Sequence, residues 1–367
     1  SRERGKDIQN ICLQCGTCNT VCGGKLDIAG MILKLRTKFA QEDGLNPVHK
    51  FCLDTVADRH LFHSMLRIAS VAQGMITKGQ PMIRHLPMFL SGLTAGRSLP
   101  SVAPQPLRDI LPTIKQDVPN PKGKIAIFTG CLLDFVYVDI ATDVVKALNM
   151  AGYIVEMPLG QACCGAPATY MGDVENAKKA AEMNLNAMEA EKYDYIVSAC
   201  PTCTHALRDY VDFFKDDPEM LKKAEELRSK TFDFCKLVSM LGGLPDTGDG
   251  VPMKVTYHDS CHLNRYLGVT KEQRELLKAT KGVELIEMHD CDKCCGFGGS
   301  YSVKFPEMSA PILEEKINNI VASGADVVAV DCPGCLLQIR VGLDARGLNN
   351  IQVKHTAQIV VEKREKK

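Results

Sequence analysis

Ten cysteines of the sequence form one pattern that occurs twice. Each copy starts with a single cysteine, continues with Cys-Cys-Gly and ends with Cys-Pro-x-Cys. The gaps agree closely, with 31 and 32 residues before the Cys-Cys-Gly motif and 35 and 36 residues after its second cysteine. The ten residues are Cys131, Cys163, Cys164, Cys200 and Cys203 in the first copy and Cys261, Cys294, Cys295, Cys332 and Cys335 in the second. Thiolates grouped in this way predict two metal sites.

Three uses of cysteine compete for this pattern. Disulfides are typical of small secreted scaffolds, whereas this sequence has 367 residues and starts with a polar segment that lacks an apolar signal region. Zinc prefers four ligands in a closed tetrahedron, and five cysteines in each copy fit that number poorly. Iron–sulfur clusters use thiolates heavily and suit a reducing cytoplasm, so we favour them over zinc and over disulfides.

Four more cysteines near the start have a different spacing, C-x2-C-x2-C-x3-C, which is the run that binds a [4Fe–4S] cluster in bacterial ferredoxins. They are Cys12, Cys15, Cys18 and Cys22. Gly23 stands where the ferredoxin motif has proline, and the sequence has one such run. The fourth ligand is therefore either Cys22 or a distant residue such as Cys52. We favour Cys22, because the shorter loop costs less entropy to close.

The residues between the cysteines predict the elements that position them. Each half has three short, β-branched apolar runs, each followed by a cysteine motif and then by a helical pattern, with clear helices expected at 177–192 and 311–323. This order predicts an α/β fold with two related βαβαβα halves and parallel sheets. Ligands gather beyond the carboxyl ends of parallel strands, so we expect the five thiols of each half to meet at one sheet edge.

We expect four segments in the chain. They are a small, helical, ferredoxin-like [4Fe–4S] segment at 1–60, a helical connector with a proline-rich linker at 61–121, the first cysteine-rich domain at 122–245 and the second at 246–367. The periodicity of residues 25–38 predicts a helix that leaves the opening cluster.

The connector has two parts with different compositions. Residues 61–93 are rich in Met, Leu and Ile and are interrupted by Gly and Pro, which predicts two or three short helices. These helices either pack on the neighbouring domains, which we favour, or offer a Met-rich surface to a partner. The prolines at 100–121 predict an extended linker.

Several other residues lie beside the motifs. We expect Cys235 and Cys291 to be structural thiols, and His258 and His262 to have polar or capping roles rather than to bind a cluster. Lys293 is either a counter-ion for a negatively charged cluster or a solvated lysine. Residues 297–300 resemble a phosphate loop but lack its Gly-Lys-Ser/Thr, so we expect them to pack around the cluster. The sequence assigns no catalytic residue.

Composition excludes several classes of function. The 44 basic residues balance 44 acidic residues, and no basic tract suggests a nucleic acid partner. The sequence has no run of about 18 apolar residues, so it predicts no membrane span. No GxGxxG motif follows a predicted strand, so we expect no NAD or FAD and no cofactor beyond the clusters.

The doubled cysteine pattern resembles the CCG domain of the heterodisulfide reductase catalytic subunit. The same domain occurs in iron–sulfur subunits of glycolate oxidase, anaerobic glycerol-3-phosphate dehydrogenase and lactate-utilisation systems. Residues 294–309, Gly324-Ala-Asp and Cys335-Leu-Leu-Gln-Ile are similar to the lactate and glycolate branch. The opening run with Lys25-Leu-Asp-Ile resembles the carboxy-terminal ferredoxin part of a second lactate-utilisation protein, so the chain resembles the C-terminal part of a fused protein.

This resemblance implies that the ten repeated cysteines bind clusters, either [4Fe–4S] or noncubane. It further implies an oxidoreductase subunit that carries electrons from a flavoprotein dehydrogenase, which oxidises lactate or glycolate, to a quinone or another acceptor. Further iron–sulfur or membrane subunits are expected as partners, and the location is cytoplasmic or peripheral at the inner face of the membrane.

Two alternatives remain at this point. The first is a heterodisulfide or thiol–disulfide reductase that uses a noncubane cluster, and the second is a zinc-stabilised scaffold without enzyme activity. A pocket open to solvent at one CCG site would favour the reductase, whereas a buried pair of sites would favour electron transfer.

Overall fold

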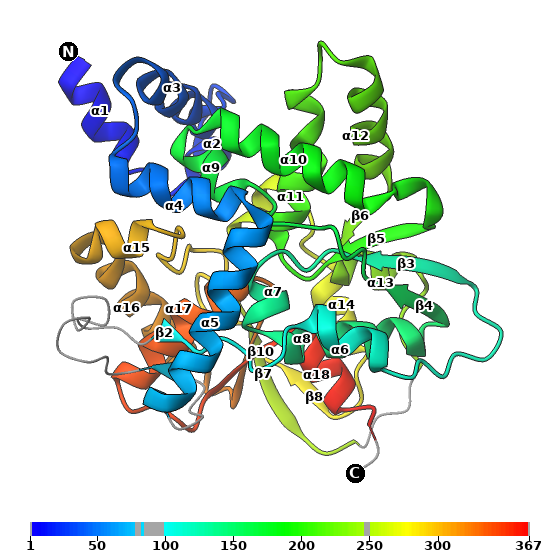
Figure 1. The fold of residues 1–367 in the computed structure, drawn as a ribbon. Coiled ribbons are helices and arrows are strands. Elements are labelled where there is room, and N and C mark those ends of the chain that lie inside the picture. The colour runs from blue at the N-terminus through cyan, green and yellow to red at the C-terminus, as the bar shows by residue number, and fades with distance from the viewer. Residues whose placement is uncertain (1, 78–81, 84–98, 246–249, 366–367) are drawn as a thin grey trace.

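The computed structural model describes residues 2–77, 82–83, 99–245 and 250–365. Two α/β halves lie side by side, and the opening helices pack across one end of both (Figure 1). The opening helices are α1 (Arg2–Asn10), α2 (Thr17–Val21), α3 (Ile28–Asp43), α4 (Pro47–Ala57) and α5 (Arg59–Thr77). A short antiparallel pair, β1 (Met82–Ile83) and β2 (Leu99–Pro100), follows them.

Each half contains a sheet of four parallel strands, and the strand order of the second sheet, read in reverse, matches that of the first. The first sheet has β3 (Gly123–Ile127), β4 (Tyr153–Glu156), β5 (Tyr195–Ser198) and β6 (Thr231–Asp233), in the order β4-β3-β5-β6. The second has β7 (Met253–Tyr257), β8 (Val283–Leu285), β9 (Val327–Val330) and β10 (Gln352–His355), in the order β10-β9-β7-β8. The predicted α/β class with two related halves and parallel sheets is confirmed.

The sequence prediction missed one strand in each half. β6 and β10 have only three and four residues and carry polar side chains, so they lack the apolar run that marked the other strands. Both are edge strands that extend the sheet beside β5 and β9. β3 and β5 lie in the middle of the first sheet, and Ile125, Ile127 and Val197 are fully buried there.

Helices cover the sheets in both halves (Figure 1). In the first half these are α6 (Leu107–Ile110), α7 (Leu132–Phe135), α8 (Val138–Met150), α9 (Ala166–Met171), α10 (Val174–Met188), α11 (Pro201–Asp209), α12 (Pro218–Lys230) and α13 (Phe234–Met240), with 3₁₀ turns η2 (Leu111–Thr113), η3 (Ala190–Lys192) and η4 (Tyr210–Phe213). In the second half these are the π-helical turn η5 (His262–Tyr266), α14 (Glu272–Lys278), α15 (Tyr301–Lys304), α16 (Pro306–Ser323), α17 (Pro333–Ala345) and α18 (Thr356–Glu362).

The predicted helices are present, with shifted ends. The helix expected at 177–192 is α10, which ends at Met188 and is followed by the 3₁₀ turn η3. The helix expected at 311–323 is α16, which begins earlier, at Pro306. The helix expected at 25–38 is α3, whose start is set by Asp27, because its side chain accepts the backbone N–H of Gly30.

The connector differs from its prediction. α5 is one helix of 19 residues rather than several short ones, and most of the region after Thr77 lies outside the described residues. The proline-rich part is not extended throughout, because α6 and η2 fold within it. Leu107 and Leu111 from these turns are 0% and 4% exposed and belong to the main core. The Gln116 side chain pairs with the backbone N–H and C=O of Val155, which satisfies the outer edge of β4.

The two halves share one hydrophobic core. α8 packs against α18, and Gln358 of α18 donates a hydrogen bond to Asp139 of α8 at 2.8 Å. The buried His355 ring lies between the carbonyl oxygens of Ala199 and Asp331, each 3.2 Å from Nε2. None of the described helices is both long enough and apolar enough to cross a membrane.

Replacing Leu107 with alanine should destabilise the first half by about 2–5 kcal/mol, because a buried leucine is removed from a packed core. The measurement is the denaturant midpoint of unfolding, followed by circular dichroism. Leu159→Ala is the matched control: Leu159 is 54% exposed, so its removal should change stability by no more than about 0.5 kcal/mol. Equal midpoints for the two variants would contradict the place of residues 101–121 in the core.

Candidate metal centre

The carboxyl ends of the strands carry the cysteine motifs to one place in each half. Cys131 and Cys261 follow β3 and β7, while Cys200 and Cys332 follow β5 and β9 and stand directly before the first residues of α11 and α17. The Cys-Cys-Gly motifs lie in the loops after the edge strands β4 and β8. The expected convergence at a sheet edge is therefore present in both halves.

The structure goes further than this expectation, because the two edges face each other. All ten cysteines of the repeat, together with Cys12, line a single cavity of about 880 Å³. Most of these thiols are buried, and the others are half-buried. The cavity is thus shared between the halves rather than divided into two separate sites.

Interactions between thiols show how closely they are packed. Neighbouring thiols of Cys163 and Cys203 lower the pKa of Cys164 to about 5. In the second half, the thiols of Cys294 and Cys335 lower the pKa of Cys295 in the same way. Each of these two sulfurs lies at the centre of a crowded group of thiols. A thiolate at this position is stabilised because it accepts hydrogen bonds from the thiols on either side.

One thiol interaction crosses between the halves. The Cys200 thiol, followed by that of Cys335, lowers the pKa of Cys332 well below its usual value. Cys200 and Cys332 are the first cysteines of the two Cys-Pro-x-Cys motifs, so the motifs meet through these two residues. The two sets of five thiols therefore form one continuous group.

Backbone groups at the Cys-Cys-Gly motifs also face the sulfurs. Gly165 and Gly296 have φ of +78° and +82°, a conformation that favours glycine, and a Cβ on Gly296 would lie 2.9 Å from the carbonyl oxygen of Ser309. This turn brings the N–H groups of Ala166 and Phe297 to the sulfurs of Cys164 and Cys295, where they favour the thiolate. Both halves use the same arrangement.

This donor set fits iron–sulfur clusters better than zinc. Ten thiols surround a cavity, with backbone N–H groups aimed at two of the central sulfurs, whereas a structural zinc site is a closed tetrahedron of four ligands. When bound, a cluster would supply one-electron redox chemistry at this place, and its iron would replace the protons that the crowded thiols share. Which cysteines bind iron stays a prediction.

The opening cysteine motif lies against the second half. The Cys294 thiol and burial raise the pKa of Cys15. Tyr266 donates a hydrogen bond to the carbonyl oxygen of Gln14 at 3.0 Å, and Arg265 donates one to that of Cys15 at 3.3 Å. Both anchors belong to η5, the turn that begins directly after Cys261. No sequence pattern indicates these contacts, because they join residues that are far apart in the chain.

The fourth ligand of the opening motif remains a prediction. The charges of Cys12 and Cys15 help to raise the pKa of Cys18, after burial, which places these three thiols near one another. Cys22 follows at the end of α2 and is half-buried, while Cys52 is exposed on α4. The Arg36 guanidinium holds the loop by donating to the carbonyl oxygens of Gln9, Cys12 and Tyr170.

The remaining candidate residues divide clearly by position. Cys235 is buried and contacts Asp331, and Cys291 accepts a hydrogen bond from Arg274. Neither thiol lines the cavity. Lys293 forms ion pairs with Asp290 and Glu315, which offset its charge. Residues 297–300 line the cavity, and their packing around a cluster stays a prediction.

The two histidines near Cys261 have different surroundings. His262 bonds with the Tyr170 hydroxyl at 2.6 Å and thereby joins the halves, and burial lowers its pKa to about 4. His258 is 1% exposed, and neither of its ring nitrogens forms a well-aligned hydrogen bond in the part of the chain that the structure describes, although the Cys291 carbonyl lies near the ring. Burial lowers the pKa of His258 to about 3, and Lys316 acts in the same direction. His258 caps none of the described helices, and the backbone polar group beside its ring belongs to Cys291.

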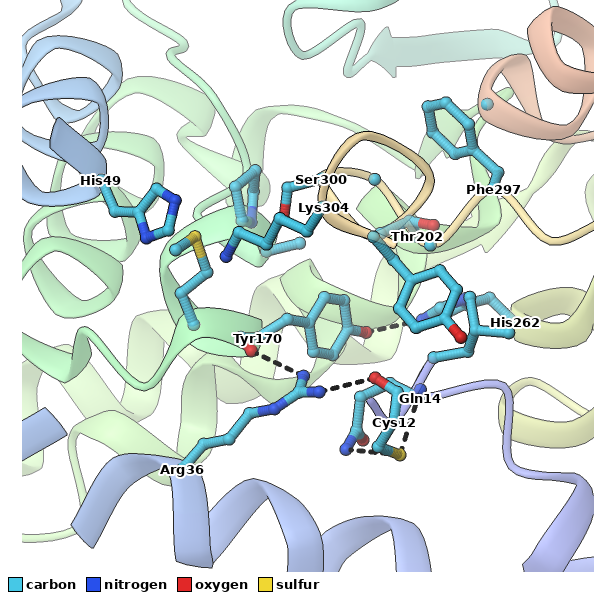
Figure 2. A pocket seen from close by; sticks show the side chains of 18 of the residues that line it. Cys12, Gln14, Arg36, His49, Tyr170, Thr202, His262, Phe297, Ser300 and Lys304 are labelled. Atoms are coloured by element: carbon cyan, nitrogen blue, oxygen red, sulfur yellow. Dashed lines mark hydrogen bonds between the residues drawn. The ribbon is translucent and has the colours of Figure 1, made fainter. Parts of the chain in front are cut away.

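The cavity continues beyond the thiols into a chamber between the opening helices and α15. Figure 2 shows His49, Lys304 and Ser300 on this side, with Arg36 nearby. Burial lowers the pKa of Lys304, and Arg36 lowers it further; Lys304 in turn lowers the pKa of His49, after burial. We call this part the cationic chamber, defined by Arg36, His49 and Lys304. The sequence did not predict it, since its residues come from three separate elements.

The fold and the paired cysteine motifs define a protein with two cysteine-rich CCG domains. The cysteine-rich CCG domain family matches residues 125–208 and 255–340. Lactate utilization protein A of Shouchella clausii is 39% identical over 240 residues, which cover 65% of this chain and 99% of the relative. The probable glycolate oxidase iron-sulfur subunit of Bacillus subtilis is 30% identical over 375 residues, covering 98% of this chain and 84% of the relative.

The chain belongs to the family of lactate utilization protein A and glycolate oxidase iron-sulfur subunits. Among solved structures, a hypothetical protein from Helicobacter pylori matches with a TM-score of 0.50 and 10% identity, covering 92% of this chain and 67% of that one. This likeness supports the fold alone.

Replacing Cys164 or Cys295 with serine should reduce the bound iron and sulfide and make the affected half more sensitive to protease. Each residue is the central thiol of its group, and metal ligation contributes folding free energy. Iron and sulfide analysis with limited proteolysis on anaerobically purified protein tests this. Cys235→Ser is the matched control, because Cys235 is buried but lies outside the cavity. Unchanged iron in both Cys164→Ser and Cys295→Ser would argue against ligation.

The opening motif has its own test. Cys22→Ser should convert the reduced EPR signal of the opening cluster to a three-iron type, because one iron loses its ligand, whereas Cys52→Ser should leave the signal as it is. The reverse result would assign the fourth position to Cys52 and leave Cys22 without a role at this cluster.

Proposed function

We propose that this protein is the iron–sulfur electron-transfer subunit of a complex that oxidises a 2-hydroxyacid such as lactate or glycolate. A flavoprotein partner would take the hydride from the substrate, and the two electrons would leave the flavin one at a time through this chain to a quinone or another acceptor. Membership of the lactate utilization and glycolate oxidase family supports this assignment.

The observation that carries the proposal is the unbroken series of thiols. Cys15 of the opening motif lies beside Cys294, the Cys294 thiol interacts with Cys295, and Cys332 meets Cys200 of the first half. Three sets of cluster ligands in contact with one another are what a one-electron relay requires. In this proposal the electrons pass from the opening motif to the second half and then to the first half.

Each set of residues has a defined part in this proposal. Cys12, Cys15 and Cys18, with Cys22, hold a [4Fe–4S] cluster, and the five cysteines of each CCG domain hold a [4Fe–4S] or noncubane cluster. The N-termini of α11 and α17, which start at Pro201 and Pro333, orient their backbone N–H groups toward the thiolates and stabilise negative charge there.

The division of labour follows from what the chain contains. Its cysteines supply electron carriers, whereas hydride transfer needs a cofactor such as a flavin. We therefore assign hydride removal to a flavoprotein dehydrogenase subunit, with further iron–sulfur or membrane subunits as additional partners. We place the complex in the cytoplasm or at the inner face of the membrane, where these partners would meet it.

A second candidate function is favoured by the cationic chamber. A thiol–disulfide reductase would need room for a substrate beside a cluster, and the chamber opens from the same cavity as the thiols. Its basic side chains suit a disulfide that carries carboxylates or phosphates. Reduction would add two electrons and two protons to the disulfide and release two thiols.

The purified chain should contain iron and acid-labile sulfide and should not oxidise lactate alone. Lactate should bleach its visible absorption only after a flavoprotein dehydrogenase is added, because the clusters have no other source of electrons from lactate. Anaerobic spectrophotometry with and without that partner makes the measurement. Stoichiometric zinc without sulfide, or lactate oxidation by the flavin-free chain, would overturn the proposal.

The same preparation distinguishes the second candidate. With reduced viologen as the electron donor, turnover of an anionic disulfide that weakens in Lys304→Gln would favour the reductase. The absence of such turnover in protein with intact clusters would favour the electron-transfer function over the reductase.

A further inference from the structure

The repeat allows the two cluster sites to be compared position by position. Phe128 and His258 each stand three residues before the first cysteine of their half. The backbone N–H of Phe128 bonds to the carbonyl oxygen of Val197 at 2.8 Å, and that of His258 bonds to Ala329 at 3.0 Å. Val197 and Ala329 are themselves equivalent, since each stands three residues before its Cys-Pro-x-Cys motif. Phe128 and His258 therefore occupy the same place in the two sheets.

The side chains at this place differ in chemistry. Phe128 is fully buried and offers only an apolar ring. His258 is nearly as buried, and a ring nitrogen, the Cys295 sulfur and the Cys335 sulfur lie within 4.8 Å of one another. Neither ring nitrogen forms a well-aligned hydrogen bond with the described residues, and the Cys291 carbonyl near the ring already accepts from Lys316 and from the Asp259 N–H. A buried imidazole in this position is costly unless something else accepts its N–H. A cluster held by Cys295 and Cys335 would be that acceptor.

At a second pair of equivalent positions, the second half has a basic side chain where the first half has a neutral one. Asn184 and Lys316 are each 16 residues before their Cys-Pro-x-Cys motif, on α10 and α16. The Asn184 amide is neutral and bonds to the carbonyl oxygen of Cys163 at 2.9 Å. Lys316 is 1% exposed, and its Nζ donates to the carbonyl oxygens of Asp290 and Cys291 at 2.6 and 3.2 Å.

The Lys316 amine is also close enough to the thiols to act on them. It interacts electrostatically with Cys295 and with Cys335, the two residues that lie beside His258. The second site therefore has a hydrogen-bond donor and a basic side chain at the positions where the first site has a phenyl ring and a neutral amide.

We propose that His258 and Lys316 make the cluster of the second half easier to reduce than that of the first, so that the second half holds the first electron. This rests on the proposed function, which places clusters in both halves. Reduction adds one electron and converts one Fe³⁺ to Fe²⁺, which makes the cluster more negative. An N–H donor to a cluster sulfur and a nearby ammonium stabilise that extra charge, and no proton has to be taken up.

The test is an anaerobic redox titration followed by EPR. The signal that Cys295→Ser removes belongs to the second half, and the signal that Cys164→Ser removes belongs to the first. We expect the second-half signal to appear at the higher potential. His258→Phe, which copies the first half, should lower that potential enough to change the reduced-to-oxidised ratio at least tenfold, or 59 mV for one electron.

Matched variants separate this role from a structural one. His258→Asn keeps an N–H donor and should restore part of the potential, Lys316→Asn should lower it, and Phe128→His should raise the potential of the first half. Iron and sulfide content is measured for each variant. If His258→Phe loses its cluster, His258→Asn and Lys316→Asn still decide the question.

Two results would overturn the inference. One is a first half that is reduced at the same or a higher potential than the second. The other is a second-half potential that neither Lys316→Asn nor a cluster-containing His258 variant changes. Absence of iron and sulfide from both halves would instead overturn the proposed function, so the two failures can be told apart.

Discussion

The crowding of buried thiols is the constraint on which the rest of the structure depends. Sulfurs such as Cys164 and Cys295 are stabilised as thiolates by their neighbours, and each charge there raises the free energy of forming the next. The apolar strands behind them cannot solvate that charge. Bound iron relieves the repulsion, so the sheets, the backbone turns at the Cys-Cys-Gly motifs and the helix N-termini all serve to hold sulfur where water is scarce.

Much of this could be predicted from the sequence, because it follows from local patterns. Short apolar runs before each cysteine motif indicated parallel strands, and the topology of such sheets placed the thiols at one edge. Strands β6 and β10 could not be found in this way, since they are short and polar and are held by pairing to β5 and β9. The buried Leu107 shows the same limit, because proline spacing suggests an extended chain and only tertiary packing explains a helix there.

The relation between the motifs was beyond sequence reasoning. Nothing in the spacing shows that Cys200 and Cys332 would meet, or that Cys15 would lie beside Cys294, because these contacts depend on how whole elements pack. His258 was expected to have a polar or capping role for a similar reason. Its burial beside the Cys295 and Cys335 sulfurs, without a well-aligned hydrogen bond, becomes visible only in three dimensions.

The anchoring of the opening motif by η5 has a consequence for the order in which the protein is made. The hydrogen bonds from Arg265 and Tyr266 to this motif join residues that are 250 and 252 positions apart. During synthesis the opening cysteines emerge before the second half, and their docking surface does not exist until the strand β7 and the turn after it have been translated. Contacts of such long sequence separation form late, because a long loop has to close before they are gained. The opening motif is thus translated well before its docking surface and is among the last parts of this sequence to reach its final position.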